Sequence, residues 1–314
     1  MIICKLSLSL KMMMKFYSNS LPSTTFNIGL IVTDFLQLTK FRLAISVVFS
    51  SLAGYLLAVD KIETNILLGL SFGGYAMVGA SNAFNQLIEK NKDSLMLRTQ
   101  NRPLPGGRMT NTLAIIIAIF LAITGVIILH YINYKTAIFG ALSIFLYTCV
   151  YTPLKSKTSL AVFVGAFPGA IPFMLGWVAA TGSFGIEPGI LFMIQFFWQF
   201  PHFWAIGWMV DEDYKKAGFK MLPTGSPDKT TAFLIVFYSF WTIVVSILPY
   251  TRYSGDLNLS IQATFALIII GIYFLYFAFK LMQEKTKRAA RKLMYASILY
   301  ISFLQIIYVI DKWI

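Results

Sequence analysis

TLAIIIAIFLAITGVIILHYI, residues 112–132, contains no Asp, Glu, Lys or Arg. A helix needs about 20 mostly apolar residues to cross a bilayer, so this stretch predicts a membrane span. The composition extends the argument to the whole chain of 314 residues, of which 57% are hydrophobic and only 12% are charged. Soluble domains carry about 25% charged residues. The sequence therefore predicts an integral membrane protein and excludes a disordered chain or a disulfide scaffold.

Eight further apolar runs of similar length lie on either side of this stretch. Only helices or closed barrels satisfy the backbone in lipid, and the runs lack the period-two alternation of a barrel. We therefore expect an all-α fold with nine transmembrane helices. The predicted spans are residues 42–60, 65–88, 112–132, 134–154, 159–181, 188–210, 231–250, 261–281 and 293–312.

The basic residues predict the orientation of the nine spans. With the N-terminus inside, 22 of the 26 Lys and Arg residues fall on inside segments. Positive charge collects on the cytoplasmic side of membrane proteins, which favours N-in/C-out. It also accounts for the basic net charge of +13 without nucleic acid. We expect residues 1–35 to be a cytoplasmic tail and residues 36–314 a single multi-pass domain in the cell inner membrane. A mitochondrial inner-membrane location is the less favoured alternative.

Five of the thirteen acidic residues form two clusters at inner ends of predicted spans, Glu89 with Asp93 and then residues 211–213. If the helix continues, Asn85, Glu89 and Asp93 share one face over about 12 Å. Oxygen ligands at this spacing suit Mg²⁺ held together with phosphate oxygens. Each cluster alone could instead be a solvated helix end.

Basic residues accompany both acidic clusters and the inner end of the fourth span. Carboxylates, Mg²⁺ and basic side chains together are suited to binding a diphosphate. Basic inner loops also follow from topology alone, so the acids carry more of the argument. The basic candidates are Arg98, Arg102, Lys155 and Lys216, with Tyr151 nearby.

Five segments are distinctive: NQLIEKNKDSLMLRTQNRPLP (85–105), YTPLK (151–155), GAFPGAIP (165–172), WQFPHFWA (198–205) and DYKKAGFKMLP (213–223). They resemble the UbiA-type intramembrane prenyltransferases, and most closely the branch that acts on protohaem IX. The resemblance runs from about residue 36 to residue 312. There are also departures: Glu89 replaces the usual Asp, a usual Lys-Pro-Arg reads Lys40-Phe41-Arg42, and Ser156 replaces a second basic residue.

The resemblance implies transfer of a farnesyl group from farnesyl diphosphate to a vinyl group of haem B, with addition of water. The product would be haem O for haem-copper oxidases, with a haem A synthase as a downstream partner. It further implies an active site facing the cytoplasm and a pair of Mg²⁺ ions bridging the diphosphate. Asn85, Glu89 and Asp93 would hold one ion, and Asp213 with Glu212 the other. The substrate-binding residues would be Arg98, Arg102, Tyr151, Lys155, His202, Glu212, Tyr214 and Lys216.

Some alternatives remain open at this point. His202 could ligate haem iron, bind a propionate or only satisfy a backbone carbonyl, although an ionisable group within a span usually marks function. The acceptor could be aromatic, such as 4-hydroxybenzoate, which would not obviously require residues 199–204. A transporter of anionic metabolites would explain the basic inner mouth. It predicts charges across the midplane, however, whereas the acids here gather at one side.

Overall fold

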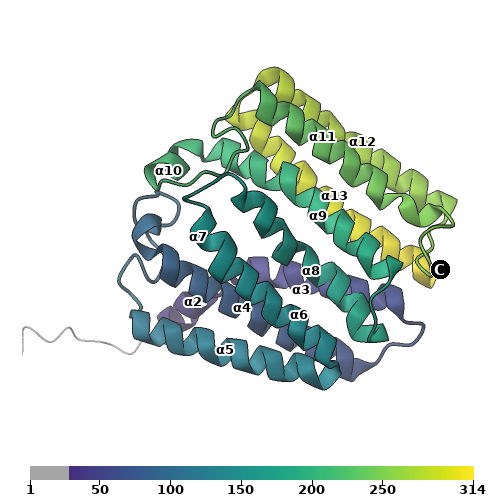
Figure 1. Cartoon of the computed structure of the whole chain (residues 1–314), viewed down its shortest axis with the longest axis horizontal. Coiled ribbons are helices and arrows are strands. Elements are labelled where there is room, and N and C mark those ends of the chain that lie inside the picture. The colour runs from purple at the N-terminus through teal and green to yellow at the C-terminus, as the bar shows by residue number, and fades with distance from the viewer. Residues whose placement is uncertain (1–27) are drawn as a thin grey trace, which may run out of the picture.

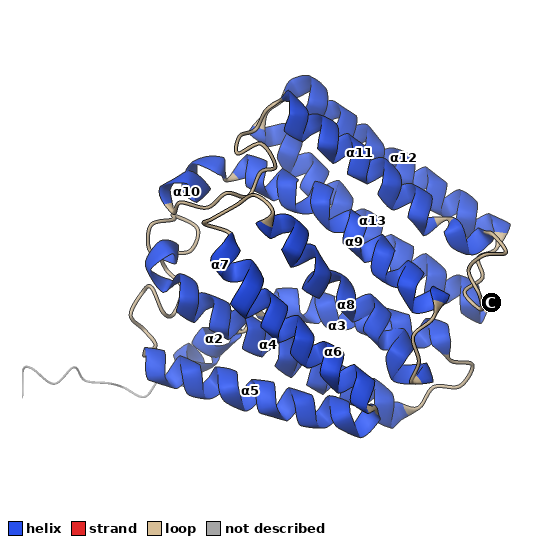
Figure 2. Ribbon diagram, in the orientation of Figure 1, coloured by secondary structure: helices blue, strands red, loops and turns tan. Residues whose placement is uncertain are grey.

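The computed structural model describes residues 28–314, and these residues form helices without strands (Figures 1 and 2). The first 27 residues of the predicted tail lie outside the described part. The helices are α2 (Ile28–Leu38), α3 (Phe41–Ala58), α4 (Thr64–Asp93), α5 (Asn111–Ile132), α6 (Tyr134–Phe145), α7 (Thr152–Leu154), α8 (Ala161–Thr181), α9 (Ile186–Met209), α10 (Asp211–Lys216), α11 (Lys229–Ser246), α12 (Ile261–Glu284) and α13 (Lys287–Trp313), with a π-helix η1 (Leu146–Tyr151) and a 3₁₀ turn η2 (Leu248–Tyr250).

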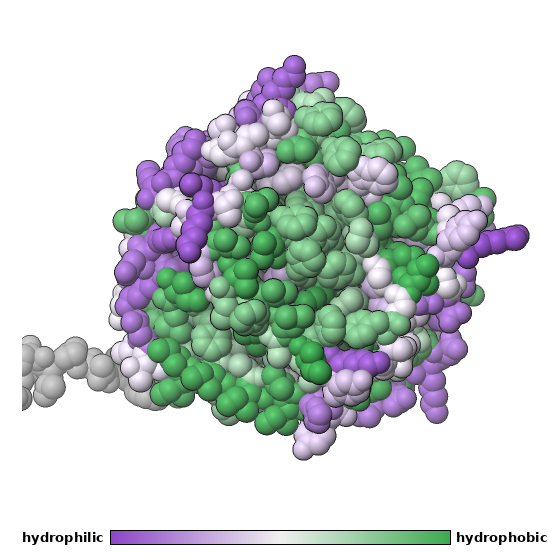
Figure 3. Space-filling model, in the orientation of Figure 1, coloured by the Kyte–Doolittle hydropathy of each residue, from purple (hydrophilic) through white to green (hydrophobic). Residues whose placement is uncertain are grey.

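Eight helical segments within residues 28–314 are long and apolar enough to cross a membrane. The remaining predicted span is α9, which is 24 residues long and contains the polar residues Gln195, Gln199 and His202. Apolar side chains cover the middle of the face shown in Figure 3, and hydrophilic ones gather toward its edges. The chain is thus a multi-pass helical membrane protein. The count of nine spans and the N-in orientation stay predictions.

Helix α2 continues across residue 35, where we expected the tail to end. Its Asp34 carboxylate is buried and accepts a hydrogen bond from Arg108 Nε at 2.9 Å. Gln86 of α4 donates to the Gln37 and Leu38 carbonyls, each at 2.9 Å. These bonds hold α2 against α4 and against the loop that follows α4.

Glycines allow α3 and α8 to approach closely at their crossing. A Cβ on Gly54 would lie 2.0 Å from the Phe173 carbonyl oxygen, and one on Gly176 would lie 1.9 Å from the Ser51 carbonyl oxygen. Small residues let membrane helices approach closely and gain van der Waals contacts. These contacts drive association, because the hydrophobic effect does not bring helices together in lipid. The contact fixes the wall of the bundle on which the site is built.

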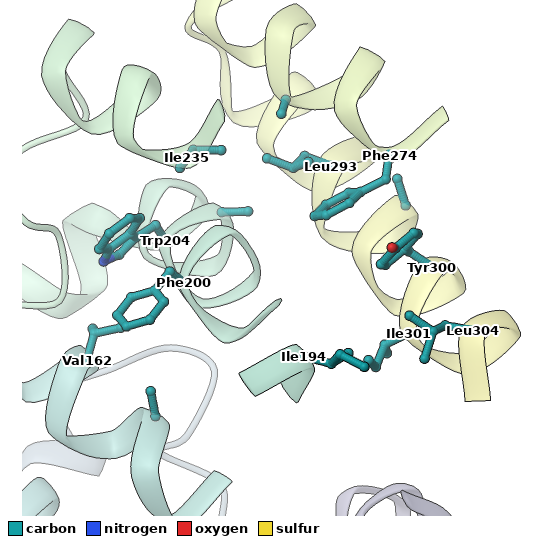
Figure 4. Packing of buried hydrophobic residues seen from close by; sticks show 14 of the residues in the cluster. Val162, Ile194, Phe200, Trp204, Ile235, Phe274, Leu293, Tyr300, Ile301 and Leu304 are labelled. Atoms are coloured by element: carbon teal, nitrogen blue, oxygen red, sulfur yellow. The ribbon is translucent and has the colours of Figure 1, made fainter. Parts of the chain in front are cut away.

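The largest buried cluster lies where α9 packs against α8, α11 and α13. Phe200 and Trp204 of α9 meet Val162 and Ile235 from two of these neighbours (Figure 4). Their aromatic rings pack one side of α9 against its neighbours. The opposite side of α9 faces a cavity.

A π-helical turn in the predicted 134–154 span places side chains at the polar end of that cavity. Pro153 has no N–H to offer the carbonyl four residues earlier, which disturbs the α-helical ladder. The chain winds as η1 over residues 146–151, and the Thr152 hydroxyl donates to the Tyr147 carbonyl at 2.8 Å. Tyr147 and Tyr151 both line the cavity as a result. Single π turns are common at functional sites.

Candidate active site

One cavity of about 680 Å³ opens among α3, α4, α8, α9 and α13. Its charged lining side chains are five basic and two acidic, and the rest of the wall is largely apolar with a few amides and hydroxyls. Nine of the twelve residues predicted for the site line it. They are Asn85, Glu89, Asp93, Arg98, Arg102, Tyr151, Lys155, His202 and Tyr214.

Helix α4 presents the first acidic cluster as the spacing predicts. The helix runs to Asp93, so Asn85, Glu89 and Asp93 follow one another along one face, and all three are buried. The Asn85 amide donates to Glu89 Oε2 at 2.9 Å and to the Thr152 hydroxyl at 3.1 Å. The two carboxylates therefore point into one confined polar region.

Glu89 forms an ion pair with Lys155, whose Nζ lies 2.9 Å from Oε1 and 3.1 Å from Oε2. Burial alone would lower the pKa of Lys155, but the Glu89 charge beside it raises the pKa above its ordinary value. The Lys155 Nζ also lies 4.6 Å from the centroid of the Tyr151 ring. Lys155 is thus a fixed cation at the polar end of the cavity.

The loop after α4 folds back to place a second cation against the acids. Arg102 donates to Asp93 Oδ2 at 2.7 Å, and the Thr99 hydroxyl donates to the Asp93 carbonyl at 2.8 Å. The loop therefore closes over the end of its own helix. Arg98 from the same loop also lines the cavity.

Lys40 is a site residue that the sequence argument did not select. It lies between α2 and α3 with a left-handed backbone (φ 49°), and its Nζ donates to Asn85 Oδ1 at 3.3 Å. Burial, and then the Arg102 and Lys155 charges, lower the pKa of Lys40 to about 7. The only sequence signal was the departure at Lys40-Phe41-Arg42, and Arg42 lines the cavity as well.

His202 lies in α9 with one ring nitrogen engaged. Its Nδ1 is 2.8 Å from the Ser297 hydroxyl of α13, and its ring stacks on Trp198 with 4.6 Å between centroids. The Trp198 indole N–H donates to the Ser297 carbonyl at 2.7 Å. These contacts hold the imidazole in one orientation on the cavity wall.

The second acidic cluster lies on α10, outside the cavity lining. Asp213 is 3.9 Å from Lys216 Nζ, while Glu212 is exposed and bonded to Lys287 at 2.6 Å. The Lys287 ammonium lowers the pKa of Glu212. Within residues 28–314, no three acidic, His or Cys side chains gather as a ready metal site. The structure thus brings the two clusters to one end of the bundle without joining them.

The α4 face nevertheless offers what a hard cation needs. Its donors are one amide oxygen and two carboxylates, the ligand types that Mg²⁺ prefers. Glu89 Oε1 is buried. Lys155 Nζ lies 2.9 Å away, but its angles do not make a hydrogen bond to this oxygen. A buried carboxylate oxygen left in this state has unused capacity for a cation. The residues present fit a divalent ion.

Side chains suited to binding an anion at one end of a largely apolar cavity fit a transferase that works within the membrane. Comparison with known proteins agrees. Residues 47–304 match the UbiA prenyltransferase family, and this chain belongs to that family. A Christiangramia forsetii protein named protoheme IX farnesyltransferase is 60% identical, over 90% of this chain and 95% of its own. A Flavobacterium psychrophilum protein of the same name is 58% identical, over 94% and 98%.

Two solved structures share the fold at low sequence identity. Digeranylgeranylglyceryl phosphate synthase superimposes with a TM-score of 0.74 at 19% identity, covering 90% of this chain and 98% of its own. A UbiA homolog from Archaeoglobus fulgidus bound to DMAPP and Mg²⁺ has a TM-score of 0.62 at 16% identity, covering 88% and 99%. The helical bundle described here is thus the UbiA fold.

Proposed function

We propose that this chain transfers the farnesyl group of farnesyl diphosphate to a vinyl group of haem B, adding water to give haem O. One observation carries the proposal: a single cavity joins an anion-binding end to a largely apolar interior with His202 on its wall. Relatives at 58–60% identity that are named protoheme IX farnesyltransferase support the choice of acceptor.

The polar end of the cavity is suited to the departure of a diphosphate. Breaking the bond between the first prenyl carbon and oxygen leaves negative charge on the diphosphate, and prepositioned cations stabilise that charge best in a water-poor site. Arg102 and Lys155 supply fixed positive charge, while Arg98 and Lys40 line the same space. Lys216 completes the proposed diphosphate contacts, although it does not line the cavity, and Tyr151 and Tyr214 are assigned to substrate binding.

Magnesium belongs to this proposal as a bound cofactor. Asn85, Glu89 and Asp93 would hold one ion, which would neutralise part of the diphosphate charge. The DMAPP- and Mg²⁺-bound relative from Archaeoglobus fulgidus supports a magnesium-dependent diphosphate site. A second ion would rely on Asp213 with Glu212. Because these residues lie on α10 outside the cavity wall, this assignment requires α10 to approach the diphosphate.

The interior of the cavity would receive the farnesyl chain and the porphyrin. Both are largely apolar, which explains why the reaction takes place within a membrane protein. His202 is an ionisable side chain on the cavity wall, and its Nδ1 contact with Ser297 leaves Nε2 for a haem group. We assign it to haem binding. The active site would face the cytoplasm of an inner membrane, and a haem A synthase would consume the product.

The experiment is an assay on purified protein in detergent with haem B, farnesyl diphosphate and Mg²⁺, with EDTA as the control. Mass spectrometry should show a haem that has gained farnesyl and water, and only when Mg²⁺ is present. Prenylation of 4-hydroxybenzoate with haem left unchanged would disprove the acceptor. Failure of the folded protein to prenylate either acceptor would favour an anion transporter instead.

A further inference from the structure

Two glutamine side chains of α9 face the cavity interior, one helical turn apart. Gln195 and Gln199 are 9% and 3% exposed, and both line the cavity. A buried amide is costly in an apolar setting unless its donors and acceptors are engaged. What each amide bonds to is therefore informative.

Each carboxamide is anchored at one atom and open at the other. Gln199 Nε2 donates to the Ala166 carbonyl at 2.9 Å and to the Gln195 carbonyl at 3.2 Å. Gln195 Oε1 accepts from Gln305 Nε2 at 3.4 Å. Neither Gln199 Oε1 nor Gln195 Nε2 has a partner among residues 28–314, and neither is sealed from the cavity. One free acceptor and one free donor thus face the same space.

Of these two atoms, Gln199 Oε1 lies just beneath the diphosphate end. Gly165 and Gly169 are one turn apart on α8 and both line the cavity. A Cβ on Gly165 would lie 2.7 Å from the Tyr151 ring, the ring that Lys155 contacts. A Cβ on Gly169 would lie 1.9 Å from Gln199 Oε1. The amide is therefore about one helical turn, roughly 5.4 Å, deeper than the Tyr151 ring.

We propose that Gln195 and Gln199 hold the water molecule that is added to the acceptor. A buried water needs two or more polar partners, and an amide N–H with an amide oxygen supplies both kinds. The proposal rests on the proposed function, because only an acceptor that gains water requires such a site. Its location between the diphosphate end and the apolar interior is where the two substrates would meet.

The step balances with the reactants already named. The electron pair of the broken carbon–oxygen bond leaves with the diphosphate, and the vinyl π pair forms the new carbon–carbon bond to the first prenyl carbon. The vinyl carbon next to the macrocycle becomes cationic. The held water donates a lone pair to that carbon, forming the carbon–oxygen bond, and its proton passes to the departing diphosphate. Without this water, the cation can lose a proton and form an alkene.

The test is the mass of the product made by Gln199→Met and Gln195→Met proteins. Each variant removes one of the two hydrogen bonds to the water and nearly conserves volume. We expect the ratio of dehydrated to hydrated farnesyl-haem to rise about tenfold in each. Ser302→Ala is the matched control, since Ser302 also lines the cavity but is bonded to neither Gln195 nor Gln199. Its product should stay hydrated.

Purely hydrated product from both active variants would overturn the proposal. So would a folded variant that still binds haem B, seen in its absorbance spectrum, yet transfers nothing, because the amides would then serve substrate positioning. Gln199→Met could fail to fold, since the Gln199 amide bonds to the backbone. Gln195→Met loses only the 3.4 Å hydrogen bond from Gln305, whose Nε2 also donates to Ser50, so this variant then tests the proposal by itself. A wild-type protein that does not farnesylate haem would refute the proposed function instead.

Discussion

Replacing Lys155 should lower both the stability and the activity of the protein, and the two losses should be separable. Lys155 and Glu89 expose only 10% and 6% of their side chains, and Nζ lies within 3.1 Å of both carboxylate oxygens. Loss of one partner from such a pair leaves a buried charge, at a cost of about 3–5 kcal/mol. Replacing both partners with neutral side chains of similar size is often nearly neutral. Lys155→Met should therefore be much less stable than Glu89→Gln/Lys155→Met.

The assay is a double-mutant cycle of unfolding free energies in detergent, together with turnover in each variant. The single variants should each lose several kcal/mol, while the double variant regains most of this loss. Turnover should be lost in all three variants, because each lacks the Lys155 cation, the Glu89 carboxylate or both. Lys280→Met is the control: its pair with Glu284 is partly exposed (30% and 42% of the side chains), and its loss should cost at most about 0.5 kcal/mol. Additive losses in the double variant would refute the coupling.

Two further predictions concern the acids and the helix packing. Asp93→Asn and Asp213→Asn should each abolish transfer while the protein still accumulates in membranes, and wild-type turnover in either would contradict the two-ion proposal. Gly176→Ala should lower folded yield and cost at least about 1–3 kcal/mol, because its Cβ would lie 1.9 Å from the Ser51 carbonyl oxygen. Gly189→Ala, where a Cβ meets nothing within 4 Å, is the control and should unfold like wild type.

The sequence could predict what depends on local period and charge. Apolar runs define the helices, and the i, i+4, i+8 spacing placed Asn85, Glu89 and Asp93 on one buried face of α4, as the structure confirms. It also placed the basic partners of these acids nearby, because Arg102 follows within one loop. The basic inner end of the fourth span also indicated Lys155, which pairs with Glu89 from 66 residues away.

The rest depended on tertiary contacts that no local pattern encodes. Lys40 reaches Asn85 only because α2 is bonded to α4 through Gln86 and so fixes the turn before α3. Gln199 looks like an ordinary polar interruption of an apolar helix until α8 is seen to leave room for its amide at Gly169. The resemblance assigned the α10 acids to the same diphosphate as the first cluster, whereas in the structure they do not line the cavity.

The cavity is charged at one end and largely apolar deeper inside, which explains how one space could bind both a diphosphate and apolar substrates. Charges are expensive inside a bilayer, so they are confined to the end where Glu89 and Asp93 can pair with cations. Deeper in the cavity, neutral amides replace them, and each is anchored by a neighbour so that it holds a fixed direction. A cation formed between these zones would find diphosphate charge on one side and ordered amide dipoles on the other. The same wall that stabilises the departing anion would therefore also select which nucleophile reaches the cation.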